Sequence, residues 1–185
     1  MRKVVLGINI TADGYCGHEN MVADAELHNY FTALLRDSSD IVFGRKTFEL
    51  MVPYWPDIAK NLNEDEATNE FAQVFNSLNI SVFSKTLKAA SKKKLQVFNG
   101  DVAGIVTALK WKEGKNITIG SLSIASQLSA YDLIDEYHFV VHPILSGQGP
   151  RLFESSALRN NLPLTLIHTK SFSSGAVVLK YIRSK

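Results

Sequence analysis

The sequence has little cysteine and proline and no long hydrophobic run. Its single cysteine, Cys16, excludes a disulfide within the chain and fits a reducing compartment, so we expect a cytoplasmic protein. No segment approaches the roughly 18 uninterrupted apolar residues of a membrane span, so we expect no membrane partner. Because neither a repeat nor a Pro/Gly/Ser-rich linker is found, we expect one domain over residues 1–185.

Positive and negative charges are nearly balanced in the sequence. Lys and Arg total 20 and Asp and Glu total 18, which gives a formal net charge of +2. So slight an excess creates no strong field toward phosphate backbones, so we expect no nucleic-acid partner. Apolar residues make up 45% of the chain, which is typical of a folded globular domain and excludes an intrinsically disordered one.

Short apolar runs rich in β-branched and aromatic residues recur along the chain. Several lack the alternation of polar and apolar residues, a pattern typical of strands that helices cover on both faces. The predicted strands are Val4–Ile10, Ile41–Phe43, Ile80–Phe83, Leu95–Phe98, Ile117–Ile119, Tyr137–Val141, Leu164–His168 and Val177–Ile182.

Helical periodicity fills most of the gaps between these runs. The predicted helices begin at Asp24, Thr47, Glu64, Asp101 and Leu122. The second is predicted to stop near Pro53, because proline disrupts a helix interior. The early alternation of strands and helices predicts an α/β fold with a mixed, mostly parallel sheet. Ser173-Ser174-Gly175 lies between the last two strands and predicts an antiparallel C-terminal hairpin.

Two segments combine the end of a predicted strand with the start of a predicted helix. In Gly44-Arg45-Lys46-Thr47 the glycine lets a ligand approach the backbone, and the free N–H groups and the two cations suit a phosphate. Gly120-Ser121-Leu122-Ser123 has a similar arrangement without the cations. The alternative for both segments is an ordinary strand-to-helix turn. Neither is a G-x-G-x-x-G or P-loop motif.

Two further segments place polar groups at strand ends. Ser84-Lys85-Thr86 offers a hydroxyl and a cation to a phosphate. In Thr11-Ala12-Asp13-Gly14 the carboxylate can orient a substrate or relay a proton, and the alternative is a simple Asp-Gly turn. His138 lies on the predicted strand Tyr137–Val141 and His142 follows it directly, and four residues of extended chain span about 13 Å. One metal ion cannot bridge that distance, so we expect no metal site.

The order and spacing of these segments resemble the dihydrofolate reductase-like superfamily, and within it the C-terminal reductase domain of the riboflavin-biosynthesis protein RibD. The run from His142-Pro143 through Gly147-Gln148-Gly149 to Leu152-Phe153 is part of the resemblance, which covers nearly the whole chain. The resemblance implies a three-layer fold with an eight-stranded sheet flanked by helices. It also implies NADPH as the cofactor and a homodimer.

The resemblance also implies roles for particular residues. Those that hold cofactor phosphates are Gly44, Arg45, Lys46 and Thr47. Those that hold the 2′-phosphate, which distinguishes NADPH from NADH, are Ser84 and Lys85. Those that pass under the pyrophosphate are Gly120, Ser121, Leu122 and Ser123. The backbone near Ile10 holds the nicotinamide amide. The family usually has a second glycine in place of Ser121, whose side chain therefore either crowds the cofactor or hydrogen-bonds a phosphate.

The function that the resemblance implies is an NADPH-dependent reductase of a small pyrimidine- or pterin-like heterocycle, similar to the phosphoribosylaminouracil reductase of riboflavin biosynthesis. Asp13 is the predicted catalytic residue. His28 stands near the place where folate reductases carry a carboxylate, which counts against folate reduction. Two alternatives stay open, namely a true dihydrofolate reductase and a non-catalytic NADP(H)-binding protein.

Overall fold

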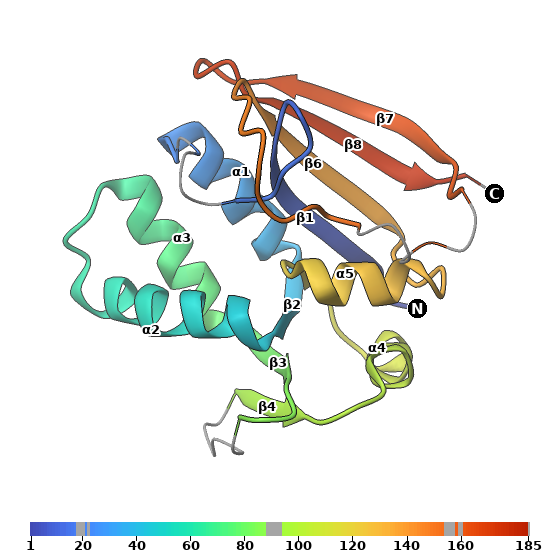
Figure 1. Cartoon of the computed structure of the whole chain (residues 1–185). Helices are drawn as coiled ribbons and strands as arrows, with labels where there is room; N and C mark the ends of the chain where they lie inside the picture. Colours follow the sequence, from blue (N-terminus) through green and yellow to red (C-terminus); the bar gives the residue numbers. More distant parts are fainter. Residues whose placement is uncertain (18–20, 22, 88–93, 154–157, 159–160, 185) are drawn as a thin grey trace.

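The fold alternates strands and helices and then ends in three strands, as Figure 1 shows for the computed structural model. The structure describes residues 1–17, 21, 23–87, 94–153, 158 and 161–184. The elements are β1 (Val4–Thr11), α1 (Ala25–Arg36), β2 (Ser38–Gly44), α2 (Arg45–Asn61), α3 (Glu66–Ser77), β3 (Asn79–Phe83), β4 (Leu95–Phe98), α4 (Val102–Trp111), β5 (Asn116–Ile119), α5 (Leu122–Ser129), β6 (Glu136–His142), β7 (Leu164–Ser171) and β8 (Val177–Arg183).

The eight strands form one sheet in the order β4-β3-β2-β5-β1-β6-β8-β7. The first six in this order are parallel, whereas β8 is antiparallel to both β6 and β7. This arrangement confirms the predicted mixed, mostly parallel sheet and its C-terminal hairpin. Gly175 makes the hairpin turn with a φ of 83°, a conformation that glycine adopts without steric cost.

Helices cover both faces of the sheet, which gives three layers (Figure 1). On one face α1, α2 and α3 pack on β2, with Leu35, Phe43, Phe71 and Phe75 at the centre of a hydrophobic cluster. On the other face, α4 and α5 pack on β1, β5 and β6 in the larger cluster. The central strands are apolar on both faces because both faces are buried, as the sequence pattern predicts.

The prediction that the second helix stops near Pro53 is wrong. Helix α2 continues to Asn61 through Pro53 and Pro56, neither of which has a backbone N–H to donate within the helix. The helix persists because Met51 and Trp55 pack against the cluster formed by α1, α3 and β2. Burial of these side chains offsets the lost hydrogen bonds, an effect that local propensity does not register.

No helix among the described residues is both long and apolar enough to cross a membrane.

Candidate functional site

The polar segments predicted from the sequence meet at one edge of the sheet. Gly44 ends β2, and its neighbour in the register of the next strand is Phe83, which Ser84 follows directly. On the other side of β2, Val42 is paired with Ile119, which Gly120 follows. Because these strands are parallel, the segments after all three lie side by side at their carboxyl ends, the usual ligand-binding edge of an open α/β sheet.

Hydrogen bonds join the start of α2 to the start of α5. The backbone N–H of Gly44 donates to Ser121 Oγ over 2.9 Å, and the Ser121 hydroxyl donates to Thr47 Oγ1 over 2.6 Å. Ser121 is only 1% exposed, so it makes these bonds away from water. The single proton of its hydroxyl is used inside the protein and is therefore not free for a phosphate.

Gly44 leaves space that any other residue would fill. A Cβ atom at this position would lie 2.9 Å from Ser123 Oγ, closer than such atoms normally approach. The φ of Gly44 is −81°, so the glycine is required here by space and not by its backbone conformation. The structure therefore brings Gly44, Thr47, Ser121 and Ser123 into one small region.

The two helices that begin in this region differ from the other three in how they start. Asp24, Asp65 and Asp101 cap α1, α3 and α4, and each carboxylate accepts a backbone N–H of the first turn. Helices α2 and α5 begin after Gly44 and Ser121 without a side-chain cap, and neither has an acidic residue in its first turn. Their first N–H groups and the positive ends of their dipoles are thus left for an external anion.

The cations beside these helix starts are not equally available. The Arg45 guanidinium pairs with both carboxylate oxygens of Glu49, at 2.8 and 3.1 Å. Lys46 and Lys85 are exposed and form no ion pair within the described part of the chain. Ser84 closes a local turn, in which its hydroxyl accepts the backbone N–H groups of Thr86 and Leu87. The free positive charge near the site therefore comes from the two lysines.

The carboxyl-terminal half of β1 has an open backbone edge. Strand β1 pairs with β6 from Val5 to Thr11, but its pairing with β5 covers only Val4 to Leu6. The backbone around Ile10 therefore has a strand on one side only among the described residues. Free N–H and C=O groups along such an edge can bind a planar amide.

Asp13 lies on the other side of β1, away from the bonds that join α2 and α5. Its carboxylate accepts the Thr11 hydroxyl at 2.6 Å and the backbone N–H groups of Ser146 and Gly147 at 3.1 and 2.7 Å. The hydrogen bonds from Thr11 and Gly147 lower the pKa of Asp13 to about 2, so the carboxylate is ionised near neutral pH.

A polar pair that the sequence patterns did not single out lies at the ends of β1 and β6. His142 Nε2 is 3.1 Å from Asn9 Oδ1, and His142 is only 1% exposed. Burial lowers the pKa of His142, so its imidazole is neutral at pH 7. The sequence offered only two separate signals, His142 after a predicted strand and an asparagine within another, otherwise apolar strand.

His28 is held on α1 by its neighbours. Its Nδ1 is 3.1 Å from the Thr68 hydroxyl, and its ring contacts the rings of Trp55 and Phe71. Burial lowers the pKa of His28, so its imidazole is neutral at pH 7. No group of three or more His, Cys, Asp or Glu side chains suited to a metal ion occurs among the described residues.

Comparisons with known proteins identify the family and the fold. Residues 2–178 match the RibD C-terminal domain. The uncharacterized Bacillus subtilis protein YyaP is 30% identical over 97% of this chain and 94% of its own length. A pyrimidine reductase-like protein from Corynebacterium diphtheriae has a similar fold, with a TM-score of 0.74 at 14% identity over 100% of this chain and 92% of that one.

The fold is also that of dihydrofolate reductase. The enzyme from Enterococcus faecalis, solved in complex with NADP(H), superposes with a TM-score of 0.62 at 13% identity over 99% of this chain and 97% of that one. The sheet order and the sequence match over nearly the whole chain lead to one conclusion: the chain belongs to the RibD C-terminal domain family.

Proposed function

We propose that this protein is a reductase that binds NADPH at the carboxyl edge of its sheet and reduces a small pyrimidine- or pterin-like heterocycle. Membership of the RibD C-terminal domain family and the dihydrofolate reductase-like fold support a reductase-type function. The observation that carries the proposal is the junction of two uncapped helix N-termini at Gly44 and Ser121, because it is suited to a ligand with more than one phosphate.

The residues at this junction fit the phosphates of NADPH. The free N–H groups of Arg45, Lys46 and Thr47 in α2, and those of Leu122 and Ser123 in α5, would face the pyrophosphate. Gly120 would pass under the same ligand, and a Cβ there would lie 3.3 Å from the Phe43 ring, so packing within the protein also favours glycine at this position. Ser84 and Lys85, at the end of the neighbouring strand, would hold the 2′-phosphate.

The other end of the site would position the reacting groups. The open edge of β1 near Ile10 would hold the nicotinamide amide, and bound NADPH supplies the hydride. Of the two roles predicted for Asp13, its low pKa supports substrate orientation over proton relay, because a group that is ionised throughout the neutral range has no proton to give. The neutral His28 in place of a carboxylate argues against dihydrofolate as the substrate. The homodimer expected from the resemblance stays a prediction, which gel filtration tests.

Thermal unfolding with NADPH, with NADH and without ligand tests cofactor binding. A ligand at a hundred times its dissociation constant adds about 2.7 kcal/mol to the free energy of unfolding, which raises the midpoint of a domain this size by about 5–11 °C. We expect this rise with NADPH and a much smaller one with NADH. An equal rise would contradict the roles of Ser84 and Lys85. No rise with either at millimolar concentration would overturn the proposal, and binding without turnover of any heterocycle would favour the non-catalytic alternative.

Two variants at one position test whether the phosphates lie against Gly44. Gly44→Asn and Gly44→Asp add side chains of the same size, so both crowd Ser123 equally. Only Gly44→Asp also places a negative charge beside the phosphates. We expect NADPH to bind Gly44→Asp at least tenfold more weakly than Gly44→Asn. Equal affinities of the two variants would place the phosphates elsewhere.

A further inference from the structure

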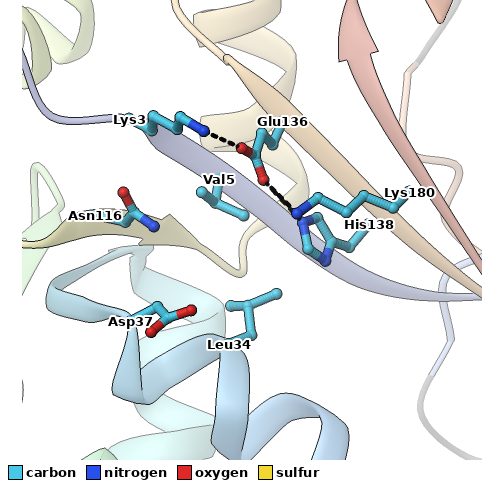
Figure 2. A pocket seen from close by; sticks show the side chains of 8 residues that line it. All are labelled: Lys3, Val5, Leu34, Asp37, Asn116, Glu136, His138 and Lys180. Atoms are coloured by element: carbon cyan, nitrogen blue, oxygen red, sulfur yellow. Dashed lines mark hydrogen bonds and ion pairs between the residues drawn. The ribbon is translucent and has the colours of Figure 1, made fainter. Parts of the chain in front are cut away.

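A second polar site lies at the opposite edge of the sheet. A cavity of about 190 Å³ opens between the C-terminal end of α1 and the amino-terminal ends of β1, β5 and β6 (Figure 2). Its lining residues are Lys3, Val5, Leu34, Asp37, Asn116, Glu136, His138 and Lys180. The eight residues of β1 separate it from the candidate cofactor edge by roughly 23 Å. A ligand in this cavity would therefore not touch the proposed nicotinamide site.

One wall of the cavity presents positive charge and hydrogen-bond donors. Lys3 Nζ donates to Glu136 Oε1 at 2.6 Å, and Lys180 Nζ lies 2.9 Å from Glu136 Oε2 (Figure 2). His138 Nε2 is 3.4 Å from the same Oε2, so both carboxylate oxygens are occupied. Each ammonium group has three N–H donors, and each uses one on Glu136. This wall thus carries two positive charges and one negative charge, and both ammonium groups keep N–H donors that Glu136 does not use.

The His138 ring has little left to offer a ligand. Its Nδ1 is 2.6 Å from the Tyr30 hydroxyl, and its Nε2 faces Glu136. Burial lowers the pKa of His138, so the ring is neutral at pH 7 and adds no charge to the wall. The two lysines therefore determine what this wall binds.

The facing wall has the opposite character. Asp37 is the C-cap of α1, where the helix dipole is negative, and its side chain points into the region below the lysines (Figure 2). Neither the Asp37 carboxylate nor the Asn116 side-chain amide has a hydrogen-bond partner among the residues that the structure describes. Val5 on β1 and Leu34, which lies beside Asp37 on α1, supply the apolar part of the lining (Figure 2).

We propose that this cavity binds a small zwitterion of the α-amino acid class. The ligand's carboxylate would meet Lys3 and Lys180, and its ammonium group would meet Asp37 and the side-chain oxygen of Asn116. A simple anion would satisfy the lysines but face the Asp37 carboxylate, and a simple cation would face the two lysines. The volume lies below the roughly 300–1,000 Å³ of pockets for drug-sized ligands, so only a short side chain fits between Val5 and Leu34.

NMR titration of the ¹⁵N-labelled protein tests this proposal without any nucleotide present, so the result does not depend on the proposed reductase function. The probes are L-alanine, acetate and ethylammonium, which carry both charges, the negative charge alone and the positive charge alone. We expect L-alanine to shift the backbone amides of Val5, Asp37 and Asn116 and to bind at least tenfold more tightly than either of the other probes.

Two variants test which wall of the cavity contacts which charged group of the ligand. Asp37→Asn should weaken L-alanine and ethylammonium at least tenfold and should not weaken acetate, whereas Lys3→Gln should weaken L-alanine and acetate and should not weaken ethylammonium. Both side chains are largely exposed, so both variants should give the spectrum of a folded protein. Asp57→Asn is the matched control, since Asp57 is exposed and does not line the cavity.

Three results would overturn the proposal. L-alanine binding no more tightly than acetate would leave a simple anion site, and shifts confined to residues outside the cavity would place the ligand elsewhere. An equal effect of Asp37→Asn and Asp57→Asn would mean that Asp37 does not contact the ammonium group.

Discussion

Replacing Ser121 with alanine should destabilise the protein by a predictable amount. The change removes the acceptor for the buried Gly44 N–H and the donor to Thr47. Thr47 is only half-buried and can bind water instead, but the Gly44 N–H loses its only described partner. An unsatisfied buried donor costs about 1–3 kcal/mol. At about 2–4 °C per kcal/mol for a chain of this size, the unfolding midpoint should fall by about 2–12 °C.

Ser123→Ala is the matched control, because Ser123 lies two residues further along, is exposed and donates no described side-chain hydrogen bond. Such a substitution normally changes the free energy of unfolding by at most about 0.5 kcal/mol. Thr47→Val should cost less than Ser121→Ala, since Ser121 still accepts the Gly44 N–H, and the double variant should resemble Ser121→Ala alone. Equal midpoints for the Ser121 and Ser123 variants in differential scanning calorimetry would refute this account of the α2–α5 junction.

Three further perturbations follow from pKa values and hydrogen bonds. Burial alone would raise the pKa of Glu136, but the two lysine ammonium groups lower it to about 2. The ionised carboxylate therefore stabilises the fold above about pH 4.5, and this stabilisation is lost as the pH falls toward 2. Glu136→Gln should lower the free energy of unfolding by about 1.5–3 kcal/mol at pH 7. In urea titrations, the variant should lose less stability than the wild type between pH 4.5 and 2. Burial lowers the pKa of His142 below 6.5, so the unfolded chain takes up its proton first and stability falls as the pH drops below 6.5. His142→Gln should reduce the decrease in the free energy of unfolding between pH 7 and 5.5. If the decrease is unchanged, groups other than His142 cause it. Asp13→Ala should speed amide hydrogen exchange at Ser146 and Gly147, and unchanged rates there would show that the carboxylate does not hold that loop.

Much of the fold was predictable because burial determines where apolar residues occur in the sequence. The runs Val4–Ile10 and Tyr137–Val141 lie in the central strands β1 and β6, where both faces of the sheet are covered and no polar alternation is needed. The hairpin was predictable because Gly175 marks a turn that needs a positive φ. The length of α2 was not, because the packing of Trp55 against other elements, which decides it, leaves no local signal.

The candidate site was predictable only in part. The resemblance located Gly44 and Ser121, but it did not reveal that the Ser121 hydroxyl binds the Gly44 N–H, since that bond joins residues 77 positions apart. The Asn9–His142 pair was missed for the same reason, because two strands must pair before the side chains meet. The absence of a side-chain cap at the start of α5 emerged only from the structure, because Ser121 is a residue type that commonly caps a helix.

The ion pair between Arg45 and Glu49 leads to opposite predictions for NADPH binding when Glu49 and Lys46 are replaced. With its guanidinium on Glu49, Arg45 contributes little net charge to the proposed phosphate site, whereas Lys46 contributes its full charge. Glu49→Gln should release Arg45 and tighten NADPH binding, and Lys46→Gln should weaken it. Each effect should be about 2–5-fold, the range of an exposed ion pair of up to about 1 kcal/mol. Both effects should shrink in high salt, because these charges are exposed. If fluorescence titrations with NADPH show no change in either variant, the basic pair at the start of α2 does not serve the cofactor.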